Sequence, residues 1–550
     1  MDAQSSASPS SPPSPSTSMS TSLSYPDALA RLAQLQSNHA VTSLFTSPPP
    51  ASASASDDLN AAAIPEMLAW LARAGYSPAA IAAAPLRCVH VAGTKGKGSV
   101  AALVASILQQ YQSDSGSGSP GGGVGSEGDE GCGMVGLYTS PHVLTPRERI
   151  VVGGQPLSEE AFARGVGEVW ARLTEAARRA AREKGAGLRG EVDEAELDGP
   201  ATKPFYFRFL TLLALHVFVT DPRVRDAVVE CGIGGEYDAT NVLPAEAVTA
   251  AVVTQLGLDH VGMLGDTVEK IAWHKSGIFK PGVKAFTRRL PDAQSGVMEV
   301  LRARAREKGA TLVEVADEEV ESWGGVEGTR LQGPFQKYNM ALAVYAAREH
   351  LLRTGVHLEG RFGTDEWSLS DIPEKFVKGL REAALRGRCE ILTDGEGIEW
   401  HLDGAHTDDS LAGVGRWFAD RTRAEDAVRV LVFNQQERNP AVLLKALLAG
   451  ARETGIGQVF THAIFTRNED HRPAEGGGRD LSVQNKARGT MQDVDRTTQT
   501  VVLDAVQPAV ERVREIAAEA RKDGMTCKVL VTGSFHLVGA VLKTVDHVEC

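Results

Sequence analysis

A glycine-rich turn between an apolar segment and an amphipathic helix limits the fold of this chain more than any other feature. Residues 88–92 form a short, mostly apolar segment, as expected of a buried strand. The residues after the turn place apolar side chains on one helical face, namely Val100, Leu103, Val104, Ile107 and Leu108. The turn itself reads Gly93-Thr94-Lys95-Gly96-Lys97-Gly98-Ser99. A strand, a glycine turn and a helix in this order predict a βα unit with a phosphate-binding loop.

The turn carries residue types that hold a nucleoside triphosphate. Glycines let backbone N–H groups approach phosphate oxygens, Lys97 supplies a positive charge, and the Ser99 hydroxyl suits Mg²⁺. The spacing differs from the common motif because Gly98 separates the lysine from the serine. The alternative is a tight turn that binds no ligand, but the flanking strand and helix favour a phosphate loop.

Two further candidates follow apolar strands. Glu230 ends the apolar segment 227–230, and carboxylates at the carboxyl end of a parallel strand point into the crevice where ligands bind. Such a carboxylate suits Mg²⁺, although an acidic strand end facing solvent is the alternative. Asp259-His260 follows the strand predicted over 249–254. Imidazole is an unusual Mg²⁺ ligand, so His260 taken alone favours a structural role.

Two weaker signals lie farther along the chain. Lys275 follows the segment EKIAWH, and a surface lysine is its default interpretation. Asp403 and His406 belong to a DGAH segment that follows the apolar pair Trp400 and Leu402, again where a strand meets a turn. Alone, that segment indicates a turn containing an aspartate.

The order of helices and strands predicts two α/β domains. Helices expected over 207–219 and 337–352 alternate with fully apolar strands, which indicates a parallel sheet covered on both faces. A second alternating series has strands predicted over 428–433, 459–465 and 529–532. We therefore predict a disordered tail over 1–24, a P-loop ATPase-type parallel-sheet domain over 25–375, and a smaller Rossmann-like α/β domain over 376–550. Loose insertions are expected at about 113–131, 180–203 and 470–493.

Composition excludes several classes of function. The chain has 550 residues and a formal net charge of -13, so nonspecific nucleic-acid binding is not expected. Its six cysteines form no CxxC pair, which favours a reducing, intracellular compartment. No apolar run reaches the roughly 20 residues that span a bilayer. The first 24 residues lack Lys and Arg, unlike a secretory signal or a mitochondrial presequence. A cytoplasmic location is the first expectation.

Taken together, these segments resemble a known family over most of residues 25–550. The chain is similar to the folylpolyglutamate synthase branch of the Mur-type ATP-dependent amide ligases. The Lys95 form of the loop, LQSN and GDTVEKIAW resemble the eukaryotic polyglutamylating type. The matching segments are YPDALARLAQLQSN, VHVAGTKGKGSV, GLYTSPHVLTPRERI, GGQPLSEEAF, ECGIGGEYDATN, LGLDHVGMLGDTVEKIAWHKSGIFKPG, LQGPFQKYN, LDGAHTDDS and VTGSFHLVGAVL.

The resemblance implies roles for individual residues. The loop Gly93 to Ser99 would hold the phosphates of ATP, with Lys97 catalytic and Ser99 near the metal of the nucleotide. Mg²⁺ would be bound through Ser140, Glu230 and His260. Lys275 matches a lysine that is carbamylated in related ligases, and the segment Gln36, Ser37, Asn38 matches a region linked to folate binding. The remaining residues expected near the nucleotide are Gln336, Asn339, Arg388, Asp403 and the catalytic candidate His406.

The resemblance also implies the reaction. The γ-carboxylate of a reduced folate, or of its polyglutamate tail, would attack ATP to form an acyl phosphate, which the amine of L-glutamate then attacks. Mg²⁺, with a monovalent cation as a further candidate, and a monomeric state complete these expectations. Eukaryotic relatives gain a mitochondrial presequence through alternative starts, so a mitochondrial form is a second expectation for location. Three alternatives stay open: dihydrofolate synthase acting on dihydropteroate, a P-loop ATPase or kinase without an amide product, and a nucleotide-binding protein without catalysis.

Overall fold

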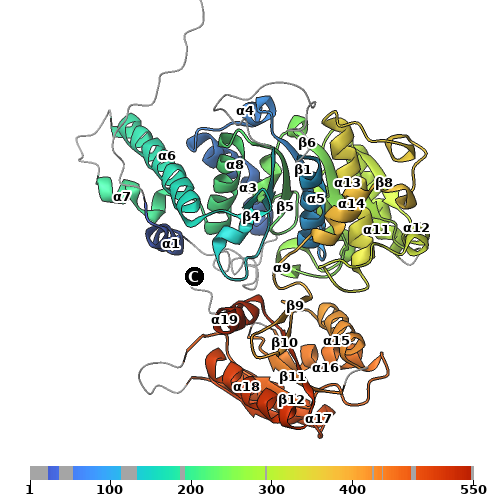
Figure 1. Ribbon diagram of the computed structural model, residues 1–550. Helices are drawn as coiled ribbons and strands as arrows, with labels where there is room; N and C mark the ends of the chain where they lie inside the picture. Colours follow the sequence, from blue (N-terminus) through green and yellow to red (C-terminus); the bar gives the residue numbers. More distant parts are fainter. Residues whose placement is uncertain are drawn as a thin grey trace, which may run out of the picture.

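The protein consists of two α/β domains, the larger one built from the amino-terminal part of the chain (Figure 1). The computed structural model describes residues 23–35, 54–112, 133–185, 193–291, 294–423, 426–436, 438–471 and 479–546. Sheet order is β4-β3-β2-β5-β1-β6-β7-β8 in the first domain and β13-β12-β11-β14-β10-β9 in the second. The predicted fold class, a parallel-sheet ATPase domain followed by a smaller Rossmann-like domain, is confirmed.

The centre of the first sheet is parallel and buried on both faces. Strands β3 and β4 pair antiparallel at one edge, whereas β2, β5, β1, β6, β7 and β8 run parallel. Every residue of β6 is buried, which explains its continuous apolar sequence. The strands are β1 (Arg87–Ala92), β2 (Met134–Tyr138), β3 (Ile150–Val152), β4 (Gln155–Pro156), β5 (Val224–Glu230), β6 (Val248–Val253), β7 (Lys284–Arg288) and β8 (Thr311–Val315).

Helices cover both faces of this sheet. On one face Val89 and Val91 of β1 pack with α5, α13 and α14, and on the other Cys88 packs with α3 and α8. Burial of each such side chain contributes about 1.5–3 kcal/mol. The helices are α1 (Tyr25–Gln34), α3 (Ser54–Arg73), α4 (Pro78–Ala83), α5 (Lys97–Gln112), α6 (Glu159–Gly185), α7 (Glu194–Asp198), α8 (Tyr206–Thr220), α9 (Val261–Leu264), α10 (Val268–Lys275), α11 (Ser295–Lys308), α12 (Asp317–Trp323), α13 (Gln336–Arg353) and α14 (Glu374–Glu382).

The second domain repeats this plan on a smaller scale. Strands β10 to β14 are parallel, and β9 pairs antiparallel at the edge. Helices α18 and α19 cover one face, and α15, α16 and α17 the other. The elements are β9 (Glu390–Thr393), β10 (Glu399–Leu402), α15 (Asp408–Thr422), β11 (Ala427–Phe433), α16 (Pro440–Arg452), β12 (His462–Phe465), α17 (Ser482–Val494), β13 (Gln499–Val502), α18 (Val506–Lys522), β14 (Thr526–Thr532) and α19 (Phe535–Asp546).

The predicted domain boundary at 375/376 is wrong. Helix α14 packs on α5, and its residues Phe376 and Leu380 are fully buried in the core of the first domain. The first domain therefore continues to Ala383, and the second sheet begins with β9. The chain passes from one domain to the other at residues 384–388. Helix α14 was not assigned to the first domain from the sequence because a polar stretch and Pro373 precede it.

Two of the expected insertions are wrong in their described parts. Residues 470–493 include α17, whose Gln484, Ala487 and Met491 are buried in the second domain. Only a few residues of α17 are apolar, so its sequence showed a weak helical pattern. Residues 193–203 are ordered by Asp198, which accepts hydrogen bonds from the Trp170 indole. The predicted tail (1–22 of it) and the insertion at 113–131 lie outside the described residues.

Strand order brings the candidate residues together. Strands β5, β1 and β6 are neighbours, so their carboxyl ends place Glu230, the glycine turn and the segment after β6 side by side. Figure 1 shows the second domain lying against this side of the first, with α9 next to the start of the second domain. Among the helices that the structure describes, none is both long and apolar enough to cross a membrane.

Candidate active site

The glycine turn has a conformation that only glycine tolerates at two positions. Gly93 and Gly96 have φ values of 149° and 85°. A Cβ atom on Gly93 would lie 1.8 Å from Thr254 Oγ1, and one on Gly96 would lie 2.5 Å from Asn339 Oδ1. Larger residues would therefore clash with Thr254, which follows β6, and with Asn339 of α13, and they would also strain the backbone. Asn339, expected near the nucleotide, does contact the loop.

Hydrogen bonds within the protein hold the turn in place. The Thr94 and Lys95 N–H groups donate to the Gln255 carbonyl at 2.9 and 3.1 Å. Thr254 Oγ1 donates to the Lys95 carbonyl at 2.7 Å. These bonds fix the loop so that little reorganisation is needed when phosphates bind. Lys97 begins α5, and Ser99 is buried two residues later.

Lys275 lies directly behind this loop. Its Nζ donates to the Gly93 carbonyl at 2.6 Å, and the side chain is 2% exposed. Burial, reinforced by the charge of Lys97, lowers the Lys275 pKa to about 7. The prediction that Lys275 belongs to the site is consistent with this position, and the surface-lysine alternative is wrong.

Glu230 provides a buried carboxylate at the end of β5. Its Oε2 accepts a hydrogen bond from the Ser140 N–H at 3.0 Å. Burial raises the Glu230 pKa, against the opposing charges of Lys97 and Arg388. A carboxylate that is desolvated and only partly compensated fits a cation. The hydroxyls of Ser140 and Ser99 supply further hard oxygens, so the residues present fit Mg²⁺.

His260 has an unusual backbone and a partner in the other domain. Its φ of 50° is left-handed, and its N–H donates to Asp259 Oδ1 at 2.9 Å. The same Asp259 oxygen accepts a bond from Arg438 of the second domain at 3.0 Å. Although burial acts in the opposite direction, the charges of His260 and Arg438 lower the Asp259 pKa to about 2. Burial lowers the His260 pKa, which keeps its imidazole neutral and able to bind a metal.

The second domain contributes a buried aspartate, Asp403, and a partly buried arginine, Arg388, whose charge acts on it. Asp403 accepts hydrogen bonds from the N–H groups of Cys389 and Ala405, both at 2.8 Å. Burial raises the Asp403 pKa, and the nearby Arg388 opposes that shift. The Arg388 guanidinium lies 4.1 Å from the Phe535 ring centroid. Its charge also acts on Glu230, so Arg388 links the two domains.

The outcome for the predicted residues is clear. Lys97 acts electrostatically on Glu230, His260 and Lys275, which places these four residues together. Gln336 joins them through a hydrogen bond from Asn339 Nδ2 at 2.8 Å. His406 lies beside Asp403 and hydrogen-bonds the Gly404 carbonyl. The folate-binding candidates Gln36, Ser37 and Asn38 lie outside the described residues.

Sequence reasoning missed several contacts of the site. Lys95 Nζ lies 3.4 Å from Asp409 Oδ2, so the Lys95 side chain forms an ion pair between the two domains. Arg438, Thr254 and Phe535 were also missed. Asp409 lies in the quoted LDGAHTDDS segment, but long-range pairs such as Arg438 with Asp259 have no local signal.

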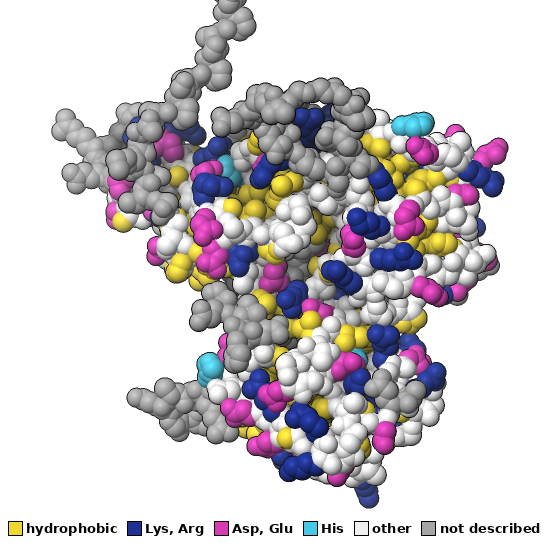
Figure 2. Space-filling model, in the orientation of Figure 1, with side chains coloured by type: hydrophobic (Ala, Val, Ile, Leu, Met, Phe, Trp, Pro, Cys, Tyr) yellow, Lys and Arg dark blue, Asp and Glu magenta, His cyan; other side chains and the backbone are white. Residues whose placement is uncertain are grey.

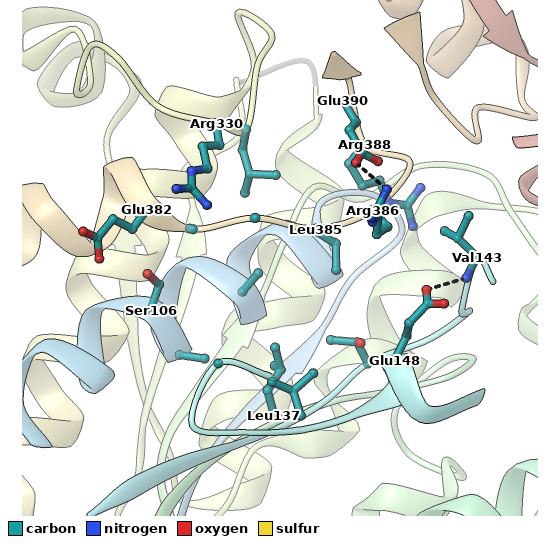
Figure 3. Close-up of a pocket in the computed structure, with 18 of the residues that line it drawn as sticks. Ser106, Leu137, Val143, Glu148, Arg330, Glu382, Leu385, Arg386, Arg388 and Glu390 are labelled. Atoms are coloured by element: carbon teal, nitrogen blue, oxygen red, sulfur yellow. Dashed lines mark hydrogen bonds and ion pairs between the residues drawn. The ribbon is translucent and has the colours of Figure 1, made fainter. Parts of the chain in front are cut away.

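A cavity of about 1000 Å³ opens from this site between the two domains. Ser140, Glu230 and Arg388 line one part of it. Figure 3 shows Arg388 at the cavity. A Cβ on Gly98 would lie 3.5 Å from Glu230 Oε2 and 3.0 Å from Leu385 Cδ2, so loop, carboxylate and interdomain segment meet. Figure 2 shows the molecule hollowed between its domains, with acidic and basic side chains interspersed on the visible face.

Comparison with known proteins agrees with this geometry. A family model described as "Dihydrofolate synthetase, C-terminal domain" matches residues 389–544. The folylpolyglutamate synthase of Saccharomyces cerevisiae (strain FostersO) is 35% identical over 541 residues, covering 96% of this chain and 87% of that protein. The Mycobacterium tuberculosis folylpolyglutamate synthase complexed with ADP and AMPPCP has a TM-score of 0.62 at 21% identity, covering 87% of this chain and 94% of that one. A solved structure described as an FPGS–AMPPCP–folate complex, where FPGS stands for folylpolyglutamate synthase, has a TM-score of 0.57 at 20% identity. The match covers 95% of this chain and 99% of that one.

A phosphate loop beside an interdomain cavity that a second-domain arginine lines is the arrangement of an ATP-dependent ligase with a Mur-ligase-like two-domain fold. Within that class, the chain belongs to the folylpolyglutamate synthase family.

Proposed function

We propose that this enzyme adds L-glutamate to the γ-carboxylate of reduced folates and their polyglutamates, using ATP and Mg²⁺. The observation that carries the proposal is the placement of the Lys97 loop beside Glu230, which lines one interdomain cavity together with Arg388. The Saccharomyces relative is named folylpolyglutamate synthase, and one solved neighbour holds AMPPCP and folate. Both names support an ATP- and folate-dependent reaction.

The residues divide the work of phosphoryl transfer. The backbone of the turn and Lys97 would hold the triphosphate, while Arg388 faces it from the second domain. Ser99, Ser140, Glu230 and His260 would hold Mg²⁺, which supplies charge neutralisation at the phosphates. Catalysis then rests on positioning the folate carboxylate in line with the γ-phosphate and on stabilising the charge that moves. Closure of the two domains over the cavity would also keep water from the acyl phosphate.

His406 has the protonation state needed for the second step. Its Nδ1 lies 2.9 Å from the Gly404 carbonyl oxygen, which can only accept, so Nδ1 carries the proton. The other nitrogen, Nε2, is then an acceptor, and burial lowers the His406 pKa so that the neutral form prevails. We propose that Nε2 accepts a hydrogen bond from the attacking amine of L-glutamate.

The direct test uses purified enzyme with ATP, Mg²⁺ and labelled L-glutamate. Tetrahydrofolate is the acceptor in one reaction and dihydropteroate in the other, and products are sized by chromatography. Products longer than one added glutamate on tetrahydrofolate support the proposal. ATP hydrolysis without labelled product would instead favour a P-loop ATPase.

Dihydrofolate synthase is the second candidate. The family model over residues 389–544 carries the name of dihydrofolate synthetase, and the two reactions share their chemistry. Label incorporated with dihydropteroate alone would select that activity. Cytoplasmic location and a monomeric state stay predictions.

The proposed metal site gives a first mutational prediction. Glu230→Gln and His260→Ala should each raise the Mg²⁺ concentration for half-maximal activity, because each removes a ligand from one site. The measurement is activity against Mg²⁺ at fixed ATP, together with Mn²⁺ binding followed by electron paramagnetic resonance. His274→Ala is the matched control, because His274 packs against Tyr237 and Trp273 instead. Two variants with the parent midpoint and parent Mn²⁺ affinity would rule out the shared site.

A further inference from the structure

The cavity between the domains extends well beyond the residues assigned to phosphate and nucleotide. Helix α5 and strands β2 and β3 form an apolar wall, to which Ala102, Ala105, Val135, Leu137 and Val151 belong. The opposite side is formed by residues 330–332, by the segment 382–388 and by β9. Figure 3 shows Arg330 and Arg388 reaching the cavity from different segments, with Leu385 between them. Much of this space is therefore open to a further part of a substrate.

Every carboxylate that lines this cavity already accepts hydrogen bonds from the protein. Of these, Glu230 is the one proposed above to bind Mg²⁺, and the other three have partners within the protein. The pairs are Glu148 with the N–H groups of Val143, Leu144 and Thr145, Glu230 with that of Ser140, Glu382 with Gln110 Nε2, and Glu390 with Arg386 NH1 and the Gly387 N–H.

Two of the arginines that line the cavity differ from these carboxylates. Arg330 and Arg421 line the cavity, and their guanidinium groups have no ion-pair or hydrogen-bond partner among the residues that the structure describes. Arg386 is paired with Glu390, and Arg388 packs on Phe535. Arg330 and Arg421 are both exposed, and their guanidinium groups can donate to a ligand in the cavity. These donors favour an anionic ligand, and guanidinium groups match carboxylates in shape.

We infer that this cavity binds the γ-linked oligoglutamate tail of the substrate, with α-carboxylates of the tail on Arg330 and Arg421. The inference rests on the proposed function. Each γ-glutamyl unit carries one α-carboxylate and two methylene groups. The carboxylates match the two arginines, and the methylene groups match the apolar wall of α5, β2 and β3.

The position of the reacting group sets the direction of the tail. A new glutamate is joined to the terminal γ-carboxylate, which must lie where Ser140, Glu230 and Arg388 line the cavity. The preceding units then continue into the rest of the cavity. ATP does not account for Arg330 and Arg421, since the loop residues Lys97 and Ser99 are not part of the lining.

The test compares acceptors that differ only in tail length. Arg330→Ala, Arg421→Ala and the double variant are assayed with tetrahydropteroyl mono-, tri- and pentaglutamate. We expect kcat/KM to fall about tenfold for a tail that reaches one arginine, and further in the double variant, because each arginine loses a charge-assisted hydrogen bond. The monoglutamate and ATP constants should change less than about twofold.

Matched controls lie next to each arginine. Arg381→Ala removes an exposed arginine whose backbone contacts Arg330, and Arg423→Ala removes one that donates to the Thr454 carbonyl, both outside the cavity lining. Neither should alter the dependence on tail length. Arg330→Lys and Arg421→Lys should keep part of the pentaglutamate activity that the alanine variants lose, since the charge is kept.

Binding without turnover gives an independent measurement. Calorimetric titration of the ATP-free enzyme with pteroylpentaglutamate should show weaker binding in both variants and steeper salt dependence in the parent. The tail assignment would be overturned if the variants lost the same factor in kcat/KM for the monoglutamate and the pentaglutamate, or if kcat/KM were unchanged for every acceptor. A raised KM for ATP in the variants would overturn it as well. A parent enzyme that joins no glutamate to any folate would instead overturn the proposed function.

Discussion

Replacement of Lys97 by alanine is expected to lower kcat by about 100- to 1,000-fold while the fold stays intact. Lys97 begins α5, and its Nζ lies 3.5 Å from the Thr94 carbonyl, so little structure depends on it. Its charge instead acts to lower the pKa values of Glu230, His260 and Lys275. Single-turnover formation of labelled product measures the loss, and circular dichroism checks the fold.

Lys270→Ala is the control for Lys97. Lys270 is exposed on α10 and pairs with Asp266 at 2.8 Å, a surface ion pair that solvent screens. It should keep parental turnover. Near-normal turnover in a well-folded Lys97→Ala variant would disprove the phosphate-loop assignment.

Replacement of Lys275 by alanine is expected to abolish most activity, and Lys275→Arg should be equally inactive. Our hypothesis is that Lys275 is carbamylated and acts as an anion, which arginine cannot become. Its burial and its pKa of about 7 favour the neutral amine that carbamylation requires. Mass spectrometry of the intact site peptide and kcat of both variants are the measurements. Added short carboxylic acids should partly restore Lys275→Ala.

The alternative is that Lys275 stays a cation and supports the loop through the Gly93 carbonyl. Arginine keeps that charge, so substantial activity in Lys275→Arg would end the carbamate hypothesis. The pH dependence has a definite sign. Above a pH of about 7 the amine is mostly neutral, so carbamylation and its dependence on CO₂ should increase as pH rises through that value.

The predictable parts of this protein are those with a local signal. Gly93 to Ser99 specified the loop because glycine, lysine and serine occur between a strand and a helix. The positions of β5 and β6 followed from continuous apolar residues, although β5 begins at Val224, before the predicted start at 227, and β6 lies one residue earlier than predicted. Helix α17 was missed because only a few of its residues are apolar, and α14 because a polar segment separates it from α13.

The contacts that join the domains had no such signal. Arg438 and Asp259 are 179 positions apart, and Lys95 and Asp409 are 314 apart. Their pairing follows from how the two sheets are placed, and residue pattern alone does not encode that placement. The same holds for the arginines of the cavity, which lie in segments of unremarkable composition.

The segment 384–388 joins the domains and also forms part of the cavity wall, through Ala384, Leu385, Arg386 and Arg388. Any rotation of one domain against the other therefore changes the shape of the space that holds the substrate. A ligand that binds one arrangement tenfold better than another favours that arrangement by about 1.4 kcal/mol. Thermodynamic reciprocity then applies: if ATP selects an arrangement that improves folate binding by some factor, folate must improve ATP binding by the same factor.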